Sequence, residues 1–155
     1  MALHLFTLKV NAQDMSFLRV DGKNVVDAKG NPFYIQGTNL GNWLNPEGYM
    51  FGFKKTISAF MIDQMFRELV GDKATDDFWQ NFKSNYVTVG DINYLASLGV
   101  NTIRLPLNYK LFTDEDYLGR NAAQDGFRII DKIVRWCKAK HIYVILDMLS
   151  LALCR

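Results

Sequence analysis

An arginine near the middle of the chain is the residue whose chemistry most needs an explanation. Arg104 lies in residues 101–109 (NTIRLPLNY), a segment otherwise rich in strand-forming apolar side chains. A buried, unpaired guanidinium is very costly, so Arg104 must face carboxylates, other polar groups or a wet cleft. Pro106 has no amide hydrogen for a sheet ladder, so we expect the strand to end there. Such an arginine is typical of ligand sites in α/β proteins, and a structural ion pair explains this segment equally well.

An aromatic loop is the second candidate for chemistry. Residues 37–53 (GTNLGNWLNPEGYMFGF) contain five glycines or prolines and four aromatic residues. Aromatic rings after a strand suit stacking on sugar faces or on bases, and Glu47 and Asn42 are available for hydroxyl contacts. The alternative is a loop that folds over its own aromatic cluster, and the pattern alone slightly favours it.

Composition bounds the class of protein. The chain has 155 residues, of which 49% are hydrophobic and 22% charged, as in one ordinary globular domain. Its net charge of +2 comes from scattered residues, so we expect neither a nucleic-acid partner nor a membrane partner. Cys137 and Cys154 form no disulfide framework and no metal-ligand spacing, and we expect no cofactor or metal.

The order of elements predicts an α/β protein. Expected strands are residues 17–20 and 25–26 around a D-G-K-N turn, then 33–37, 101–107 and 142–147. Expected helices are residues 58–70, 76–86, 92–98 (opened by a capping box at 88–91) and about four turns around 127–137. Strands that alternate with helices indicate right-handed βαβ units around a parallel sheet.

The first residues carry an ambiguous signal. Residues 1–15 hold a short apolar stretch followed by Val10-Asn11-Ala12, small enough for signal-peptidase cleavage. Lys9 interrupts the apolar part and no basic region precedes it. The segment resembles the remnant of a secretion signal, which implies a secreted or periplasmic protein. A frayed terminus explains it equally well.

Three segments together resemble glycoside hydrolase family 5, the cellulase-like (β/α)8 barrels, with exoglucanase-like members closest. DGKNVVDAKGNPFYIQGTNLGNWLNPEG is similar to the family's opening hairpin, first barrel strand and following loop. LASLGVNTIRLPLNY is similar to the helix and second strand with its active-site arginine, and HIYVILDM to the third strand. The resemblance implies a truncated (β/α)8 TIM barrel over residues 16–148, made of an N-terminal β-hairpin and the first three βα units.

The resemblance also implies an activity and a set of site residues. The family consists of retaining β-glycosidases, so the implied substrates are β-glucan-type polysaccharides or oligosaccharides. Arg104 matches the arginine that keeps the nucleophile carboxylate ionised, as expected of a permanent cation beside it. Glu47 matches an acidic residue that contacts sugar. The family's loop positions that flank the substrate cleft are matched here by Asn39, Trp43 and Tyr109.

Departures from the family pattern are equally informative. Retaining glycosidases need two carboxylates about 5–5.5 Å apart. The family carries them after its fourth and seventh strands, for which this sequence has no counterpart, so we expect an inactive chain with Arg104 lacking its carboxylate. Leu149 stands where the family has a histidine, and residues 149–155 (LSLALCR) read as an aberrant tail such as a frameshift produces. Asp147, at a strand end, is expected to have a structural role.

Two other functions remain open at this point. A non-catalytic carbohydrate-binding fragment would use Trp43, Tyr49 and Glu47, although its exposed strand edges would favour aggregation. An unrelated α/β protein could bind an anionic metabolite through Arg104. The sequence has no glycine-rich fingerprint or phosphate loop after any strand, which disfavours this last alternative.

Overall fold

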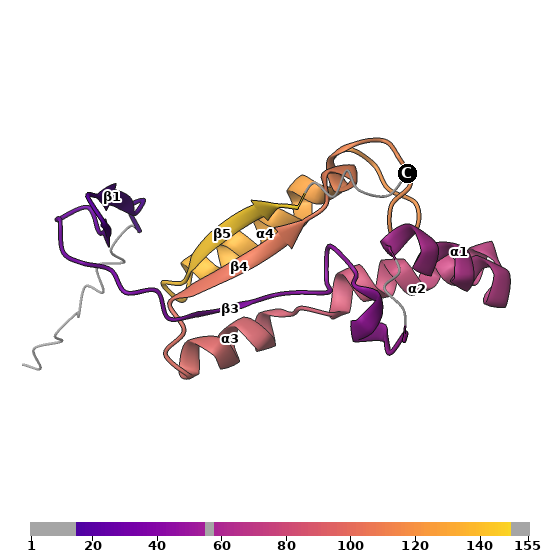
Figure 1. Cartoon of the computed structure of the whole chain (residues 1–155), viewed down its shortest axis with the longest axis horizontal. Helices are drawn as coiled ribbons and strands as arrows, with labels where there is room; N and C mark the ends of the chain where they lie inside the picture. Colours follow the sequence, from indigo (N-terminus) through magenta and orange to yellow (C-terminus); the bar gives the residue numbers. More distant parts are fainter. Residues whose placement is uncertain (1–14, 55–57, 150–155) are drawn as a thin grey trace, which may run out of the picture. The chain divides into compact units, whose positions relative to one another are not determined.

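A computed structural model describes residues 15–54 and 58–149 of the chain (Figure 1). Nearly all of the predicted signal remnant at residues 1–15, and of the predicted aberrant tail at residues 149–155, lies outside the described residues. The chain forms two compact units that divide after Tyr34, and each is described by itself.

The first unit contains the predicted hairpin. Strand β1 (Arg19–Asp21) pairs antiparallel with β2 (Asn24–Val26), and Gly22 in the turn has a φ of 59°, which favours glycine. Asp27 accepts two backbone hydrogen bonds in the next turn, and Val26 forms a bridge with Pro32. The hairpin prediction is therefore confirmed, with slightly different strand boundaries.

The second unit is built on a parallel sheet, as predicted. Strands β3 (Gly37–Asn39), β4 (Thr102–Leu107) and β5 (Tyr143–Met148) lie in the order β3-β4-β5. The prediction of a strand at residues 33–37 is wrong, because pairing with β4 begins only at Gly37. Strand β4 also continues past Pro106, which lies opposite Asp147. A proline removes a single donor from the ladder and leaves its carbonyl free to accept.

The predicted helices are present, with some different boundaries. They are α1 (Ala59–Val70), α2 (Asp72–Asn85), α3 (Val89–Ser97) and α4 (Asp125–Lys138), with two short 3-10 helices, η1 (Gly48–Phe51) and η2 (Tyr109–Phe112). Ser58 caps α1, and Thr88 and Asp91 form the predicted capping box of α3. Helix α2 begins four residues before the predicted start at 76, since only Gly71 separates it from α1.

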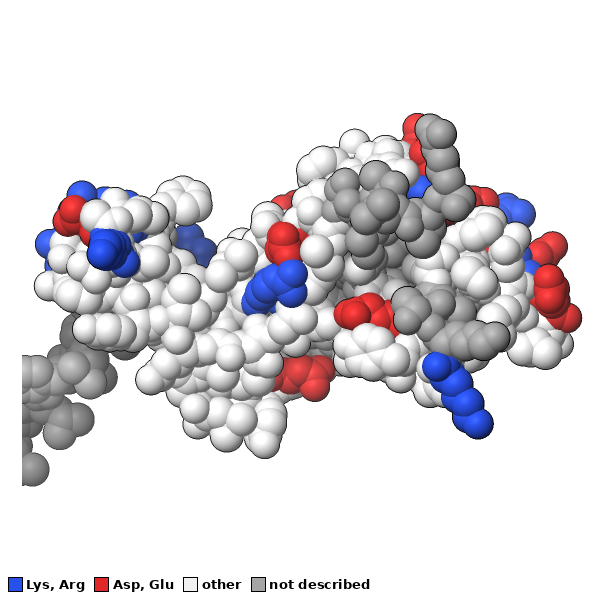
Figure 2. Space-filling model, in the orientation of Figure 1, with Lys and Arg blue, Asp and Glu red and all other residues white. Residues whose placement is uncertain are grey.

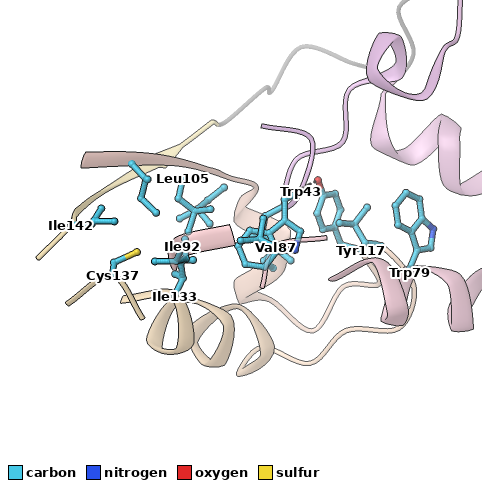
Figure 3. Packing of buried hydrophobic residues seen from close by; sticks show 14 of the residues in the cluster. Trp43, Trp79, Val87, Ile92, Leu105, Tyr117, Ile133, Cys137 and Ile142 are labelled. Atoms are coloured by element: carbon cyan, nitrogen blue, oxygen red, sulfur yellow. Dashed lines mark hydrogen bonds between the residues drawn. The ribbon is translucent and has the colours of Figure 1, made fainter. Parts of the chain in front are cut away.

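The core lies between β4 and the helices. Ile103, Leu105 and Leu107 alternate along β4 and are fully or almost fully buried. A continuous row of buried side chains runs from Ile142 to Trp79 (Figure 3). Strand β5 leaves Ile145, Leu146 and Met148 exposed, so this apolar strand is not covered on both faces.

Charges are dispersed over this part of the molecule. Lys, Arg, Asp and Glu side chains are scattered over the face shown in Figure 2, with no large patch of one sign. Among the described residues, no helix is long and apolar enough to cross a membrane.

Candidate functional site

Arg104 is paired on both sides within the sheet. Its Nη1 donates to Asn39 Oδ1 at 3.0 Å, and its Nη2 forms a salt bridge with Asp147 Oδ2. The side chain remains 40% exposed, so it borders solvent rather than a closed core. The expectation that Arg104 lacks a carboxylate is therefore wrong, and the interpretation of Asp147 as structural now has a definite meaning: Asp147 holds this guanidinium.

Parallel register explains how these three residues meet. On β3, the direct partner of Arg104 is Asn39. On β5, its direct partner is Ile145, and Asp147 lies two residues beyond Ile145. Because alternate residues of a strand point to one face, Asn39, Arg104 and Asp147 share a face of the sheet. The arginine thus lies between an amide on β3 and a carboxylate on β5.

Glu47 lies close to this group, beside Asn39. A Cβ placed on Gly41 would be 3.3 Å from Asn39 Nδ2 and 3.9 Å from Glu47 Oε1, so both side chains border the same glycine. The backbone amide of Glu47 donates to the side chain of Asn42 at 3.0 Å. Asn42 is buried, with a φ of 63°, and thereby fixes the turn that presents Glu47.

Tyr49 is an exposed ring next to Glu47. The residue is 68% exposed, and the Glu47 carboxylate lies near enough to act on its hydroxyl. The negative charge of Glu47, with a smaller effect of burial, raises the pKa of Tyr49. An exposed ring beside a carboxylate can stack on a sugar and bind its hydroxyls.

Trp43 does not line a cleft. Its side chain is fully buried, and its Nε1 donates to the backbone carbonyl of Lys83 at 3.0 Å. Phe51 and Phe53 likewise pack against the core, with ring centroids 6.5 Å apart. The expectation that Trp43 flanks the substrate is therefore wrong: a large ring with its N–H satisfied is more stable inside. For these three residues, the alternative of a loop folded over its own cluster is correct.

Tyr109 is the first residue of η2 and is 45% exposed. That it flanks the substrate cleft stays a prediction. Sequence reasoning missed its neighbour Asn108, whose Oδ1 caps η2 and whose Nδ2 donates to Asn45 Oδ1 at 3.4 Å. It also missed Tyr117, whose hydroxyl contacts the carbonyl of Leu44 and whose pKa is raised by burial. These contacts tie the loop after β3 to the loop after β4. The asparagine that directly follows the strand was the available signal.

The described residues contain no group of three or more His, Cys, Asp or Glu side chains placed to hold a metal ion. The polar groups that meet beside the sheet are instead those that bind hydroxyls and carboxylates. They are Arg104, Asn39, Asp147, Glu47 and Tyr49.

Replacing Asp147 with alanine tests the contacts of Arg104. We expect a loss of about 1–2 kcal/mol in the free energy of unfolding, because a charge-assisted hydrogen bond is lost but water screens the partly exposed pair. Urea unfolding measures it, with Asp131→Ala on the exposed face of α4 as control. Equal stability of the two variants would show that the pair contributes nothing.

Comparisons with known proteins agree with this architecture. The chain is 34% identical over 134 residues to a beta-xylosidase of Phanerodontia chrysosporium, covering 86% of this chain and 28% of that protein. It is 28% identical over 153 residues to a probable glucan 1,3-beta-glucosidase A of Aspergillus clavatus, covering 95% and 34%. The crystal structure of a rutinosidase from Aspergillus niger matches with a TM-score of 0.57 and 23% identity, covering 77% and 34%.

The chain thus spans about a third or less of the length of these proteins. Residues 26–152 match the family model described as Cellulase (glycosyl hydrolase family 5). The resemblance found in the sequence is confirmed, and so is a fold that represents part of a (β/α)8 barrel. The chain belongs to glycosyl hydrolase family 5.

Proposed function

We propose that this chain forms the first part of the substrate cleft of a retaining β-glycosidase that acts on β-glucan-type polysaccharides. The observation that carries the proposal is the position of Arg104 between Asn39 and Asp147, on one face of adjacent parallel strands. Barrel enzymes hold their sites at the carboxyl ends of such strands. Asn39 ends β3, and Asp147 lies one residue before the end of β5.

Arg104 has donors to spare for a catalytic carboxylate. A guanidinium carries five N–H donors, and the described residues Asn39 and Asp147 engage two of them. A further carboxylate brought beside Arg104 would be held ionised and oriented, because a permanent cation lowers the pKa of a neighbouring acid. Asn39 and Asp147 would then fix the direction of the guanidinium.

Glu47, Tyr49 and Tyr109 are proposed to contact the sugar. The carboxylate can accept two hydroxyl hydrogen bonds, and the exposed rings offer apolar faces. The names of two relatives, a beta-xylosidase and a glucan 1,3-beta-glucosidase, support β-linked glycans as the substrate class. We further propose that the full-length protein acts outside the cytoplasm, where such polymers occur.

The 155-residue chain alone is expected to release no reducing ends from β-glucan. Retaining hydrolysis needs an acid/base and a nucleophile, and the family pattern places neither within residues 1–155. The assay should include Arg104→Met, which would share any contaminating background. Turnover by the natural chain that Arg104→Met abolishes would contradict this expectation.

A second candidate function, carbohydrate binding without catalysis, is favoured by the exposed Tyr49 beside Glu47. Calorimetric titration with cello- and laminari-oligosaccharides tests it. If the site binds, Glu47→Gln should weaken affinity about tenfold, the effect of one charge-assisted hydrogen bond. Glu68→Gln, on the exposed side of α1, is the matched control. Absence of saturable binding by the folded chain would exclude this function.

A further inference from the structure

A small hollow between α2 and α4 gathers cationic side chains away from the cleft. It has a volume of about 140 Å³ and opens to solvent. Lys83 of α2 lines it together with Asp125, Arg128 and Lys132 of α4. None of the side chains proposed to face the sugar or to hold Arg104 borders it. The hollow therefore needs an explanation of its own.

Lys83 is the unusual residue in this hollow. It occupies the buried stripe of α2, four residues after Trp79 and eight after Thr75, where an amphipathic helix normally places an uncharged side chain. The residue is only 7% exposed. No hydrogen bond or ion pair joins its ammonium to any residue within the described part of the chain. The aliphatic stem of Lys83 is buried, whereas its ammonium reaches the solvent of the hollow and has no partner there among the described residues.

The surrounding carboxylates act on Lys83 only at longer range. Burial lowers the pKa of Lys83, and the charges of Asp125, Asp76 and Asp116 oppose that shift. Asp76 is already paired with Arg67 at 2.8 Å, and Asp116 is exposed. These carboxylates offset part of the effect of burial at Lys83, and none of them accepts a hydrogen bond from its ammonium.

The rim of the hollow adds two more cations. Arg128 Nη1 contacts Asp125 Oδ1 at 2.9 Å, and 74% of the arginine side chain remains exposed. The ammonium of Lys132 lies 5.0 Å from the centre of the Trp136 ring. Lys83, Arg128 and Lys132 carry three positive charges and Asp125 carries one negative charge, so the lining has a surplus of two.

We propose that this hollow binds a phosphate-type dianion. Its two negative charges match the surplus of the lining, and its oxygens would accept from the otherwise unpaired ammonium of Lys83. Arg128 and Lys132 would contact the outward-facing oxygens. A bound dianion would link α2 to α4 and so hold the helices that follow β3 and β4 in the sequence.

The test is a titration of the 155-residue chain with inorganic phosphate at constant ionic strength, followed by amide chemical shifts and thermal unfolding. We expect saturable shifts at residues 80–84 and 125–132 and a rise in Tm. Lys83→Met should lose at least tenfold in affinity while the protein stays folded, because methionine suits a buried helical position. Lys73→Met, on the same helix but 89% exposed and paired with Asp77, should bind as the natural chain does.

A second variant, Arg128→Gln, changes an exposed side chain and leaves the core intact. It should weaken the binding of phosphate about threefold or more. Methyl phosphate distinguishes a free ion from a phosphate ester as the natural ligand, and binding of either supports the proposal. Three results would overturn it: no saturable response to phosphate or methyl phosphate, unchanged affinity in Lys83→Met, or an equal loss in Lys73→Met.

Discussion

Trp79→Ala should lower the free energy of unfolding by about 3–5 kcal/mol, the range for deleting a buried aromatic side chain. The ring is fully buried in the centre of an aromatic cluster. Its centroid lies 5.0 Å from that of Phe78, 5.6 Å from Phe82 and 5.7 Å from Phe66. These rings are fixed by two helices, so they can collapse only partly into the space left by the indole.

The indole also completes a polar network that links α1 to α2. Its Nε1 donates to Asp63 Oδ1 at 2.9 Å, and Asp63 accepts from Arg67 at 2.8 Å. Arg67 in turn reaches Asp76 at 2.8 Å, and these carboxylates raise its pKa. Alanine would therefore remove a hydrogen bond to a charged acceptor as well as apolar contacts.

Urea unfolding of Trp79→Ala and Trp79→Phe compares loss of the whole ring with loss of part of it. Phenylalanine retains a buried ring but loses the N–H and part of the indole volume, so it should cost roughly 1–3 kcal/mol. Trp136→Ala, a half-buried tryptophan on α4, is the matched control and should cost less than Trp79→Ala. A loss below about 1 kcal/mol in Trp79→Ala would contradict the central role of this ring.

The same cluster supports the proposed sugar-binding loop. Phe51, at the end of η1, lies 6.2 Å from the Trp79 ring and 5.6 Å from that of Phe82. Glu47 and Tyr49 stand at the start of that 3-10 helix. Removal of Trp79 is therefore expected to loosen the loop and to weaken any binding of oligosaccharide that depends on Glu47.

Regular elements were predictable because their signals are local. The Ser58 cap and the Thr88–Asp91 box mark helix starts within a few residues, and Gly71 marks the end of α1. The parallel sheet followed from the alternation of strands and helices. The family was predictable for a similar reason, since each of its three motifs occupies one short, continuous stretch of the chain.

The contents of the site were less predictable, because they depend on contacts distant in sequence. Trp43 and Tyr49 lie in one irregular loop without periodicity, and nothing local shows that the first is buried and the second exposed. Arg104 pairs with Asp147, which lies 43 residues later in the sequence, through the register of β4 and β5. Lys83 follows Thr75 and Trp79 at the helical spacing of buried positions, although lysine is typical of exposed positions.

Gly37→Ala should cost about 1–3 kcal/mol by overpacking and should disturb the pairing of β3 with β4. Gly37 lies opposite Thr102, and a Cβ there would be 2.3 Å from the Thr102 carbonyl oxygen and 3.1 Å from its carbon. Both are backbone atoms, so β3 itself must move. Asn39 is two residues further on, so its 3.0 Å contact with Arg104 should be lost as well.

Two measurements check this prediction. Urea unfolding reports the stability, and hydrogen exchange reports the Leu40 amide, which donates to the Arg104 carbonyl at 2.9 Å and should exchange faster in the variant. Gly90→Ala is the control: its Cβ would meet only Thr88 Oγ1 at 3.3 Å, inside helix α3. Alanine there should be neutral or add up to about 1 kcal/mol, because it reduces the entropy of the unfolded chain. Unchanged Leu40 exchange in Gly37→Ala would mean that β3 holds Asn39 against Arg104 without needing this close approach.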